Sequence, residues 1–357
     1  MVILSIETSC DETALSLLET RGNGDSFEYK VLGNIVHSQI EIHKEYGGVF
    51  PILAKREHIK NLPLLYEKIL KDSGIEEKQI ETIAVTEGPG LEPALWTGIL
   101  FAKELAAKLN VPIIPINHME GHIVSTIFTT TEVSKNFSSL KSLELPALAV
   151  LVSGGHTELV EVARLGSYKH LGRTRDDAIG EAFDKVARML NLPYPGGPEI
   201  SRLAQMAREK NLAKTVTLPR PMIHSKDLDF SFSGLKTSIL YLLRELGENI
   251  LDEKKQEIAR EFEDAVTEVL ITKTREALSS SEFKTLVVGG GVIANIHIRK
   301  AFEGLAQEFD IPLYLPAQGL TGDNALMIAL AAALFPTKTK GPSDIKARGN
   351  LSLETLD

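Results

Sequence analysis

The sequence lacks the features that secreted and membrane proteins usually carry. It contains one cysteine, Cys10, in 357 residues, which excludes an internal disulfide and fits a reducing compartment. No apolar run approaches membrane-spanning length. The amino terminus has no basic first segment, and Glu7 interrupts its apolar run too early for a signal peptide. We therefore expect a cytoplasmic protein that makes no membrane contact.

An excess of basic charge is also lacking. The formal net charge is −9, which argues against binding of nucleic acid over a broad basic face, because such a face needs clustered Lys and Arg. The densest basic segment near a motif lies at residues 169–175, and a solvated loop explains it at least as well. The charge balance therefore leaves nucleic-acid binding open but unsupported.

The chain is long enough for two domains, and it repeats its own pattern. An apolar content of 43% supplies a sizeable core for each domain. The order strand, glycine loop, helix, proline-containing connection and strand starts at Thr82 and again at Thr285. Hairpin patterns at 2–18 and 147–162 precede the two copies, and the Ser- and Thr-rich segment 129–142 separates them. We therefore predict an α/β fold of two similar lobes with a central cleft. The predicted divisions are a first lobe at 1–128, a second lobe at 145–321, and a C-terminal helix and tail at 322–357 that pack back on the first lobe or the interface.

A pair of histidines follows the last strand of the first copy. His118 and His122 stand at i and i+4, so a helix that begins here brings both imidazoles to one metal ion. The second copy carries Asp323 at the equivalent place, and a pseudo-twofold relation between the lobes brings it to the same cleft. Two histidines and one carboxylate leave coordination positions open, as iron(II) or catalytic zinc requires. The alternatives are two surface histidines and an Asp323 that only caps the following helix.

The spacing of this stretch argues against a metalloprotease of the zincin kind. Such an enzyme needs His-Glu-x-x-His, with the glutamate directly after the first ligand to activate water. Met119 occupies that place, and Glu120 lies about 200° round the helix from the first histidine. Proteolysis is therefore disfavoured.

Two hairpin tips carry residue types that suit a phosphate group. The first tip holds Asp11 and Glu12 among small hydroxyl residues, and the second is Ser153-Gly154-Gly155. Glycines let backbone amides approach a ligand closely, as an adenylate or phosphate site requires. Ordinary polar hairpin turns explain both tips as well.

Taken together, the short motifs of the chain resemble those of one family. The motifs are IETSCDET (6–13), YGGV (46–49), GPGL (88–91), NHMEGH (117–122), VSGGHT (152–157), GEAFDK (180–185), PGGP (195–198), FSFSGLKT (230–237), GGGVIAN (289–295) and TGDNA (321–325). The resemblance is to the universal tRNA threonylcarbamoyladenosine transferase family of the TsaD type, once described as a sialoglycoprotein endopeptidase, and it runs from the amino terminus to about Ala333.

The resemblance implies an actin-like fold, related to sugar kinases and Hsp70, and an acyltransferase that acts in tRNA modification. The implied reaction moves a threonylcarbamoyl group from threonylcarbamoyl-AMP to the exocyclic amine of the adenosine beside the anticodon, in tRNAs that read codons beginning with A. It implies one divalent metal, iron(II) first with zinc or magnesium as alternatives, and a site that ATP, ADP or AMP also occupies. The implied partners are tRNA and, in bacteria, a paralogous dimerisation partner and a small ATPase.

Carried onto matching positions, the resemblance gives three groups of site residues: catalytic candidates, metal ligands and substrate contacts. Asp11 and Glu12 are catalytic candidates near the nucleotide, and no residue is assigned as a general base. The implied metal ligands are His118, His122 and Asp323. The implied substrate contacts are Leu151, Val152, Ser153, Gly154, Gly155, Asp184, Gly197 and Asn295.

Two other functions compete with this one. A small-molecule kinase on the same fold explains the duplicated lobes and the glycine loops, but it gives the two histidines no task. A nucleotide-dependent scaffold or chaperone-like ATPase predicts protein partners and no tRNA product. The acidic charge favours partner proteins in every case, and we expect tRNA affinity to be shared with them.

Overall fold

The computed structural model describes residues 1–247, 250–317 and 319–354. The chain divides into two compact units. Unit 1 comprises Met1–His43, Val49–Leu143 and Leu315–Asp357, and unit 2 comprises Lys44–Gly48 and Glu144–Tyr314. Each unit is built on a sheet of its own. Among the described residues, no helix is both long enough and apolar enough to cross a bilayer.

The sheet of unit 1 has the strand order β5-β4-β1-β2-β3-β6. Its three parallel strands β5, β4 and β1 are almost entirely buried, which explains why they read as continuous apolar runs. Strands β2 and β3 continue the sheet in antiparallel fashion. The strands are β1 (Val2–Glu7), β2 (Glu12–Arg21), β3 (Glu28–Ser38), β4 (Thr82–Gly88), β5 (Ile113–Asn117) and β6 (Ser138–Ser139).

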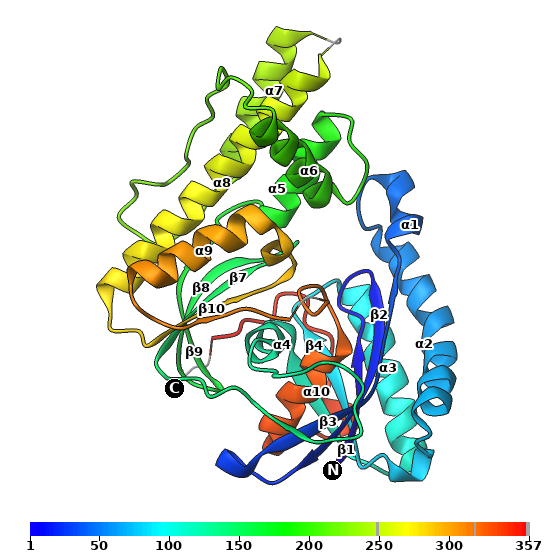
Figure 1. Ribbon diagram of the computed structural model, residues 1–357. Helices are drawn as coiled ribbons and strands as arrows, with labels where there is room; N and C mark the ends of the chain where they lie inside the picture. Colours follow the sequence, from blue (N-terminus) through cyan, green and yellow to red (C-terminus); the bar gives the residue numbers. More distant parts are fainter. Residues whose placement is uncertain (248–249, 318, 355–357) are drawn as a thin grey trace. The chain divides into compact units, whose positions relative to one another are not determined.

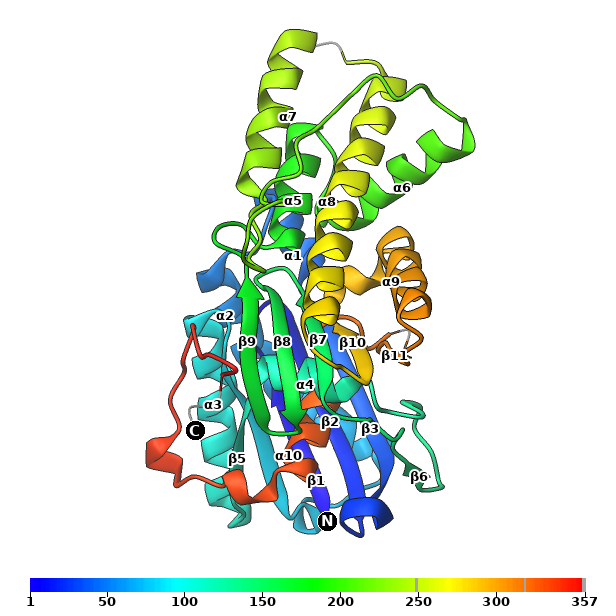
Figure 2. The same ribbon diagram turned by 90° about the vertical axis from the view of Figure 1, so that its left-hand side faces the viewer.

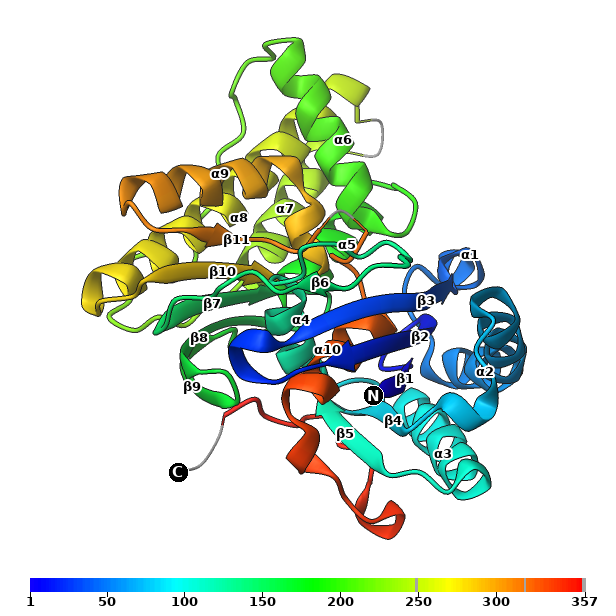
Figure 3. The same cartoon turned by 60° about the horizontal axis from the view of Figure 1, so that its bottom comes forward.

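Helices cover both faces of this sheet. Helices α2 and α3 pack on one face, and α4 and α10 pack on the other (Figures 1 and 3). Every residue of α10 from Ala325 to Ala333 is buried, as expected of a helix that is apolar all round. The helices are α1 (Ile40–His43), α2 (Pro51–Ser73), α3 (Glu92–Leu109), α4 (His118–Ser125) and α10 (Ala325–Leu334), with 3₁₀ turns at Gly24–Ser26, Glu77–Gln79, Pro336–Lys338 and Pro342–Asp344.

The sheet of unit 2 has the strand order β11-β10-β7-β8-β9. Strands β11, β10 and β7 run parallel, and β8 and β9 continue in antiparallel fashion. This is the arrangement of β5, β4, β1, β2 and β3 in unit 1, so the predicted α/β class with duplicated lobes is confirmed. The strands are β7 (Ala147–Val152), β8 (Thr157–Arg164), β9 (Ser167–Arg173), β10 (Thr285–Gly289) and β11 (Leu313–Tyr314).

A group of helices completes unit 2 (Figure 2). The long helix α8 contacts β7, α6 and α9, and α5 contacts both α6 and α7. The helices are α5 (Ile179–Met189), α6 (Gly196–Glu209), α7 (Ser233–Leu246), α8 (Asp252–Ser280) and α9 (Ile296–Glu308), with 3₁₀ turns at Lys44–Tyr46 and Gly291–Ala294.

Candidate functional site

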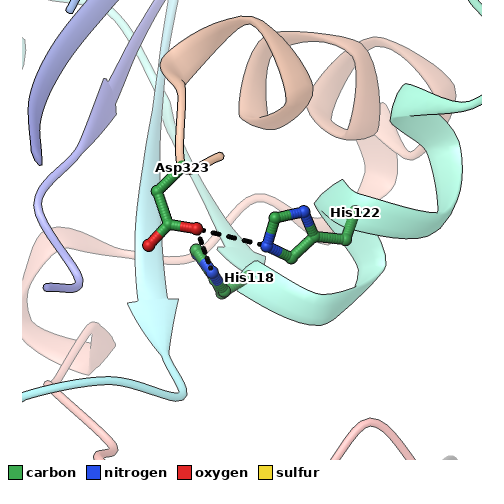
Figure 4. A group of neighbouring side chains, drawn as sticks. All are labelled: His118, His122 and Asp323. Carbon is green, nitrogen blue, oxygen red and sulfur yellow. Dashed lines mark ion pairs between the residues drawn. The ribbon is translucent and has the colours of Figure 1, made fainter. Parts of the chain in front are cut away.

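Two histidines and one aspartate meet in unit 1 (Figure 4). His118 is the first residue of α4, and Asn117 caps that helix by accepting a hydrogen bond from the Met119 amide at 2.9 Å. His118 and His122 are therefore one turn apart on the same face. The Nε2 atom of each histidine lies 3.2 Å from Oδ1 of Asp323.

Asp323 reaches the histidines because the chain returns to unit 1 after β11. Helix α10 packs against α4 and against β1 and β2, which places the residue just before it over α4. The helix cap is Asn324, whose Oδ1 accepts a hydrogen bond from the Met327 amide at 3.0 Å. The alternative in which Asp323 only caps the helix is therefore wrong. All three residues belong to unit 1.

The chemistry of this cluster fits a divalent metal ion. One donor atom from each residue lies within 4.8 Å of the other two, and both histidines are buried. The Nδ1 atom of His122 has no hydrogen-bond partner among the described residues. Two imidazoles and one carboxylate suit zinc or iron(II) and leave positions for further ligands.

The charges of the cluster support one another. Burial alone would lower the pKa of His118, but the carboxylates of Asp323 and Glu7 outweigh burial and raise this pKa well above its ordinary value. Burial would raise the pKa of Asp323, but the two histidines lower it. Burial lowers the pKa of His122 despite the hydrogen bond to Asp323. The site is thus a largely buried cluster of side chains with complementary charge.

Sequence reasoning missed one member of this neighbourhood. Glu7 is the last residue of β1, is fully buried, and places Oε2 at 2.9 Å from Nδ1 of His118. A signal was present, because an acid at the end of an otherwise apolar strand must find a partner when that strand is buried. By contrast, Glu120 pairs with Lys338 at 2.8 Å, so it is not placed to activate water beside the histidines.

The two catalytic candidates lie at the tip between β1 and β2. Asp11 is buried, and Glu12 begins β2. Burial, together with the charges of Asp11 and Asp323, raises the pKa of Glu12 well above its ordinary value. His58, also buried, supports the tip from α2 through a 3.0 Å hydrogen bond between its Nε2 and the Cys10 carbonyl. Glu12 is therefore a carboxyl group that binds its proton more tightly than an exposed glutamate does.

The glycine-rich tip lies in unit 2, between β7 and β8. Leu151 and Val152 end β7. The Ser153 hydroxyl accepts a hydrogen bond from the His156 amide at 3.1 Å. Apart from the glycine itself and its two chain neighbours, no atom of the described residues lies within 4 Å of the position that a Cβ would take at Gly154 or Gly155. The backbone of this tip is therefore open to a ligand.

Two further glycines let neighbouring segments close on this tip. A Cβ at Gly180, near the start of α5, would lie 2.8 Å from Cα of Gly154. A Cβ at Gly290, just after β10, would lie 2.3 Å from the Val152 carbonyl oxygen. The tip, α5 and the loop after β10 therefore meet at the carboxyl ends of the parallel strands β7 and β10, where open α/β sheets bind ligands.

The remaining predicted contacts lie on helices of the same unit. Asp184 of α5 accepts a hydrogen bond from the Gly196 amide at 2.7 Å, which fixes the first turn of α6 and with it Gly197. Asn295 caps α9, and its Nδ2 donates to Glu263 at 2.6 Å. The eight predicted substrate contacts all belong to unit 2.

Solved structures with a similar fold differ widely in sequence. A full-length HypF in its phosphate- and nucleotide-bound form aligns with a TM-score of 0.56 at 14% identity, over 94% of this chain and 46% of that one. The HypF of T. kodakarensis aligns with a TM-score of 0.54 at 14% identity, over 94% of this chain and 47% of that one. Identities this low establish the fold alone.

Sequence relatives are much closer. A tRNA N6-adenosine threonylcarbamoyltransferase of Burkholderia mallei is 45% identical over 94% of this chain and 92% of its own. A protein of the same name from Polynucleobacter asymbioticus is 43% identical over the full length of both chains. The model of the TsaD family, described as tRNA N6-adenosine threonylcarbamoyltransferase, matches residues 30–330. The chain therefore belongs to the TsaD family of tRNA N6-adenosine threonylcarbamoyltransferases.

Proposed function

We propose that this protein transfers a threonylcarbamoyl group from threonylcarbamoyl-AMP to N6 of the adenosine beside the anticodon, in tRNAs that read codons beginning with A. The family match carries this proposal, because residues 30–330 include the histidine pair, Asp323 and the glycine-rich tip. A small-molecule kinase or a scaffold ATPase gains no such support.

The reaction is an acyl-type transfer. The exocyclic nitrogen of adenine attacks the carbamoyl carbon, the bond from that carbon to the phosphate oxygen breaks, and AMP leaves with the bonding electrons while the nitrogen gives up a proton. This nitrogen is a weak nucleophile because its lone pair is delocalised into the ring. The protein must therefore assist mainly at the carbonyl group and the leaving phosphate.

In this proposal His118, His122 and Asp323 hold one divalent metal ion, with iron(II) as the first expectation and zinc or magnesium as alternatives. The two imidazole donors favour iron(II) or zinc over magnesium. Such an ion supplies Lewis acidity toward a carbonyl or phosphoryl oxygen. Both histidines are buried and Asp323 is partly buried, which restricts the movement of the donor atoms. Asp11 and Glu12 remain candidates for a catalytic role at the neighbouring tip.

Unit 2 binds the adenylate in this proposal. The backbone at Gly154 and Gly155, which has open space around it, is suited to an anionic phosphate, and Ser153 begins this tip. The first turn of α6, which includes Gly197, and the cap of α9 at Asn295 add helix amino termini that favour negative charge. Leu151, Val152 and Asp184 complete the proposed contacts.

We further propose that tRNA is bound together with protein partners, a paralogous dimerisation partner and a small ATPase. The net charge of −9 supports this division, because an acidic chain is poorly suited to bind tRNA alone. Tight binding of tRNA by the isolated chain at physiological salt would argue against it.

The test is a transfer assay with unmodified tRNA, threonylcarbamoyl-AMP and the purified chain, to which partners are added in turn. We expect the modified nucleoside to form only when the chain is present. We expect His118→Ala to remove most of the product and the bound metal together. Full metal content and full transfer in that variant would show that the metal assignment is wrong. Absence of product in every combination would contradict the proposed reaction itself.

A further inference from the structure

The two histidines of the metal cluster are supported in different ways. On one side of His118, Nε2 faces Asp323 Oδ1 at 3.2 Å, and on the other side Nδ1 lies 2.9 Å from Glu7 Oε2. His122 has no such second carboxylate: its Nδ1 has no hydrogen-bond partner in the described part of the chain. The ring centroids lie 4.7 Å apart at 88°, so each ring also limits how the other can turn.

Glu7 is itself held firmly. Its Oε2 accepts a hydrogen bond from the Thr86 hydroxyl at 2.6 Å, and its Oε1 accepts one from the Ser9 amide at 2.5 Å. Glu7 lies on β1 and Thr86 on β4, neighbouring strands at the centre of the unit 1 sheet. The carboxylate is fully buried. Its position beneath His118 is therefore set by the sheet.

The carboxylate of Glu7 distinguishes the two ring nitrogens of His118. Nε2 faces Asp323, which is itself a ligand of the proposed metal site, whereas Nδ1 faces Glu7 and, at 3.2 Å, the Ser9 hydroxyl. An ionised carboxylate only accepts hydrogen bonds, so in the neutral ring that would bind a metal ion Nδ1 is the donor to Glu7. The lone pair of the neutral ring then lies on Nε2, the nitrogen that faces Asp323 and His122. A carboxylate that fixes a histidine tautomer in this way commonly strengthens metal binding.

We propose that Glu7, supported by Thr86, is a positioning residue that holds His118 in the Nδ1–H tautomer and so selects His118 Nε2 as a metal-binding atom. The inference rests on the metal site of the proposed function. It adds that His118 is the oriented ligand of the pair, whereas His122 faces Asp323 through Nε2 and has no second carboxylate at Nδ1 among the described residues. Glu7 does not bind the metal.

The test measures metal binding by the full chain without tRNA or adenylate. Zn²⁺ and Co²⁺ affinities are obtained by competition with a chromophoric chelator. We expect Glu7→Gln to weaken both by about 10- to 100-fold, because the amide lacks the charge and fixes the tautomer less firmly. Thr86→Val should weaken them less, because the carboxylate stays and loses one of its hydrogen bonds.

A matched control is Glu120→Gln. Glu120 is a buried carboxylate on α4 itself, but it pairs with Lys338 and not with a histidine. We expect this variant to bind both ions as the wild type does, within about two-fold, which is small beside the effect of losing a supporting carboxylate. Equal weakening in the two Glu variants would mean that any buried charge lost near α4 loosens the site, and it would overturn the inference.

A spectroscopic readout separates positioning from general destabilisation. The visible absorption of bound Co²⁺ depends on the geometry of its ligands, so Glu7→Gln should change its shape at saturating metal, whereas Glu120→Gln should not. Fluorescence of Trp96, the single tryptophan of the chain, checks that each variant is folded. If Glu7→Gln binds and absorbs as the wild type does while His118→Ala loses binding, Glu7 has no positioning role. If His118→Ala also binds normally, the metal site of the proposed function is wrong instead.

Discussion

The two sheets share one topology but end in different chemistry. In unit 1, the carboxyl ends of β1 and β5 lead to Glu7 and His118, both buried and ionisable. In unit 2, the equivalent ends of β7 and β11 lead to Ser153 and to the segment that leaves the unit. Only Gly290 lies between β10 and the next helical turn, which begins at Gly291. The same fold thus places ionisable side chains at the carboxyl ends of the strands in unit 1, and glycine backbone without side chains at the equivalent strand ends in unit 2.

The difference follows from what each kind of site needs. A metal site requires donor atoms at fixed positions, and these must be paired with one another when buried. A phosphate site built from amides requires glycines, since a side chain at Gly290 would collide with β7. The duplicated fold can therefore diverge at its strand ends while its cores stay alike.

The largest effect is expected from a variant that tests whether the metal cluster of unit 1 works independently of the proposed AMP site of unit 2. Asp323→Ala should abolish stoichiometric metal binding and reduce transfer by about 100-fold or more, because it removes a ligand outright. AMP affinity, measured by calorimetry, should stay within about two-fold, since the proposed AMP contacts are in unit 2. Asp72→Ala, at an exposed ion pair on α2, is the control. Loss of AMP binding in Asp323→Ala would show that the two sites are not separable.

A second prediction concerns the charged cluster that supports unit 2. Arg208 of α6 pairs with Glu263 and Asp264 of α8, and Glu263 is fully buried. Arg208→Gln should destabilise unit 2 by about 3 kcal/mol, because it leaves that carboxylate without its cation. Hydrogen exchange should rise in α6 and α8 at denaturant levels where Trp96 fluorescence, in unit 1, is unchanged. Arg202→Gln, at an exposed pair, should leave exchange as in the wild type.

A third prediction tests the bare backbone of unit 2. Gly290 has φ +97° and lies against Val152, so Gly290→Ala should cost about 2 kcal/mol of unfolding free energy and weaken AMP binding. Metal content should not change. Gly304→Ala is the matched control: it lies within α9 with open space around it and should stabilise the helix by up to about 1 kcal/mol. If Gly290→Ala bound AMP as strongly as the wild type does, the proposal that the backbone around Gly290 shapes the AMP site would be wrong.

The smallest effect is a pH dependence of unit 2. Burial would raise the pKa of Asp264, but hydrogen bonds from His297 and Arg208 lower it to about 2. A lowered pKa in the folded state means that the unfolded chain binds the proton more readily, so this group stabilises the fold above its ordinary pKa and loses that contribution as the pH falls toward about 2. Exchange in α6 and α8 should therefore rise between about pH 4 and pH 2. Asp264→Asn should show a shallower rise.

Much of this comparison was predictable because it depends on local pattern. The strand, glycine loop and helix order after Thr82 and Thr285 gave the duplicated sheets, and the spacing of His118 and His122 gave their shared face. The meeting with Asp323 followed from equivalent positions in the repeat. The predicted domain limits and site residues stay predictions until they are tested by experiment.

Long-range partners that the internal repeat does not relate could not be predicted from the sequence. Glu7 and His118 lie far apart in the chain, and only the alignment of β1 beside β4 and β5 brings them together. The Asn324 cap was missed because Asp323 and Asn324 both suit a helix start. The pairing of Arg208 with Glu263 depends on how α6 crosses α8, and helix crossing is set by packing and not by local sequence.

The place of helix α10 near the end of the chain determines when, during synthesis, unit 1 can finish folding. This helix supplies the face of the unit 1 sheet opposite α2 and α3, and Ser5 of the first strand donates a hydrogen bond to the Ala325 carbonyl at 2.6 Å. A ribosome releases residue 5 early and Asp323 almost last, so a nascent chain carries both histidines long before their carboxylate. The proposed metal site can therefore be completed only after synthesis has passed through all of unit 2, and incorporation of metal would report that the chain has been made past Asp323 and that unit 1 has folded.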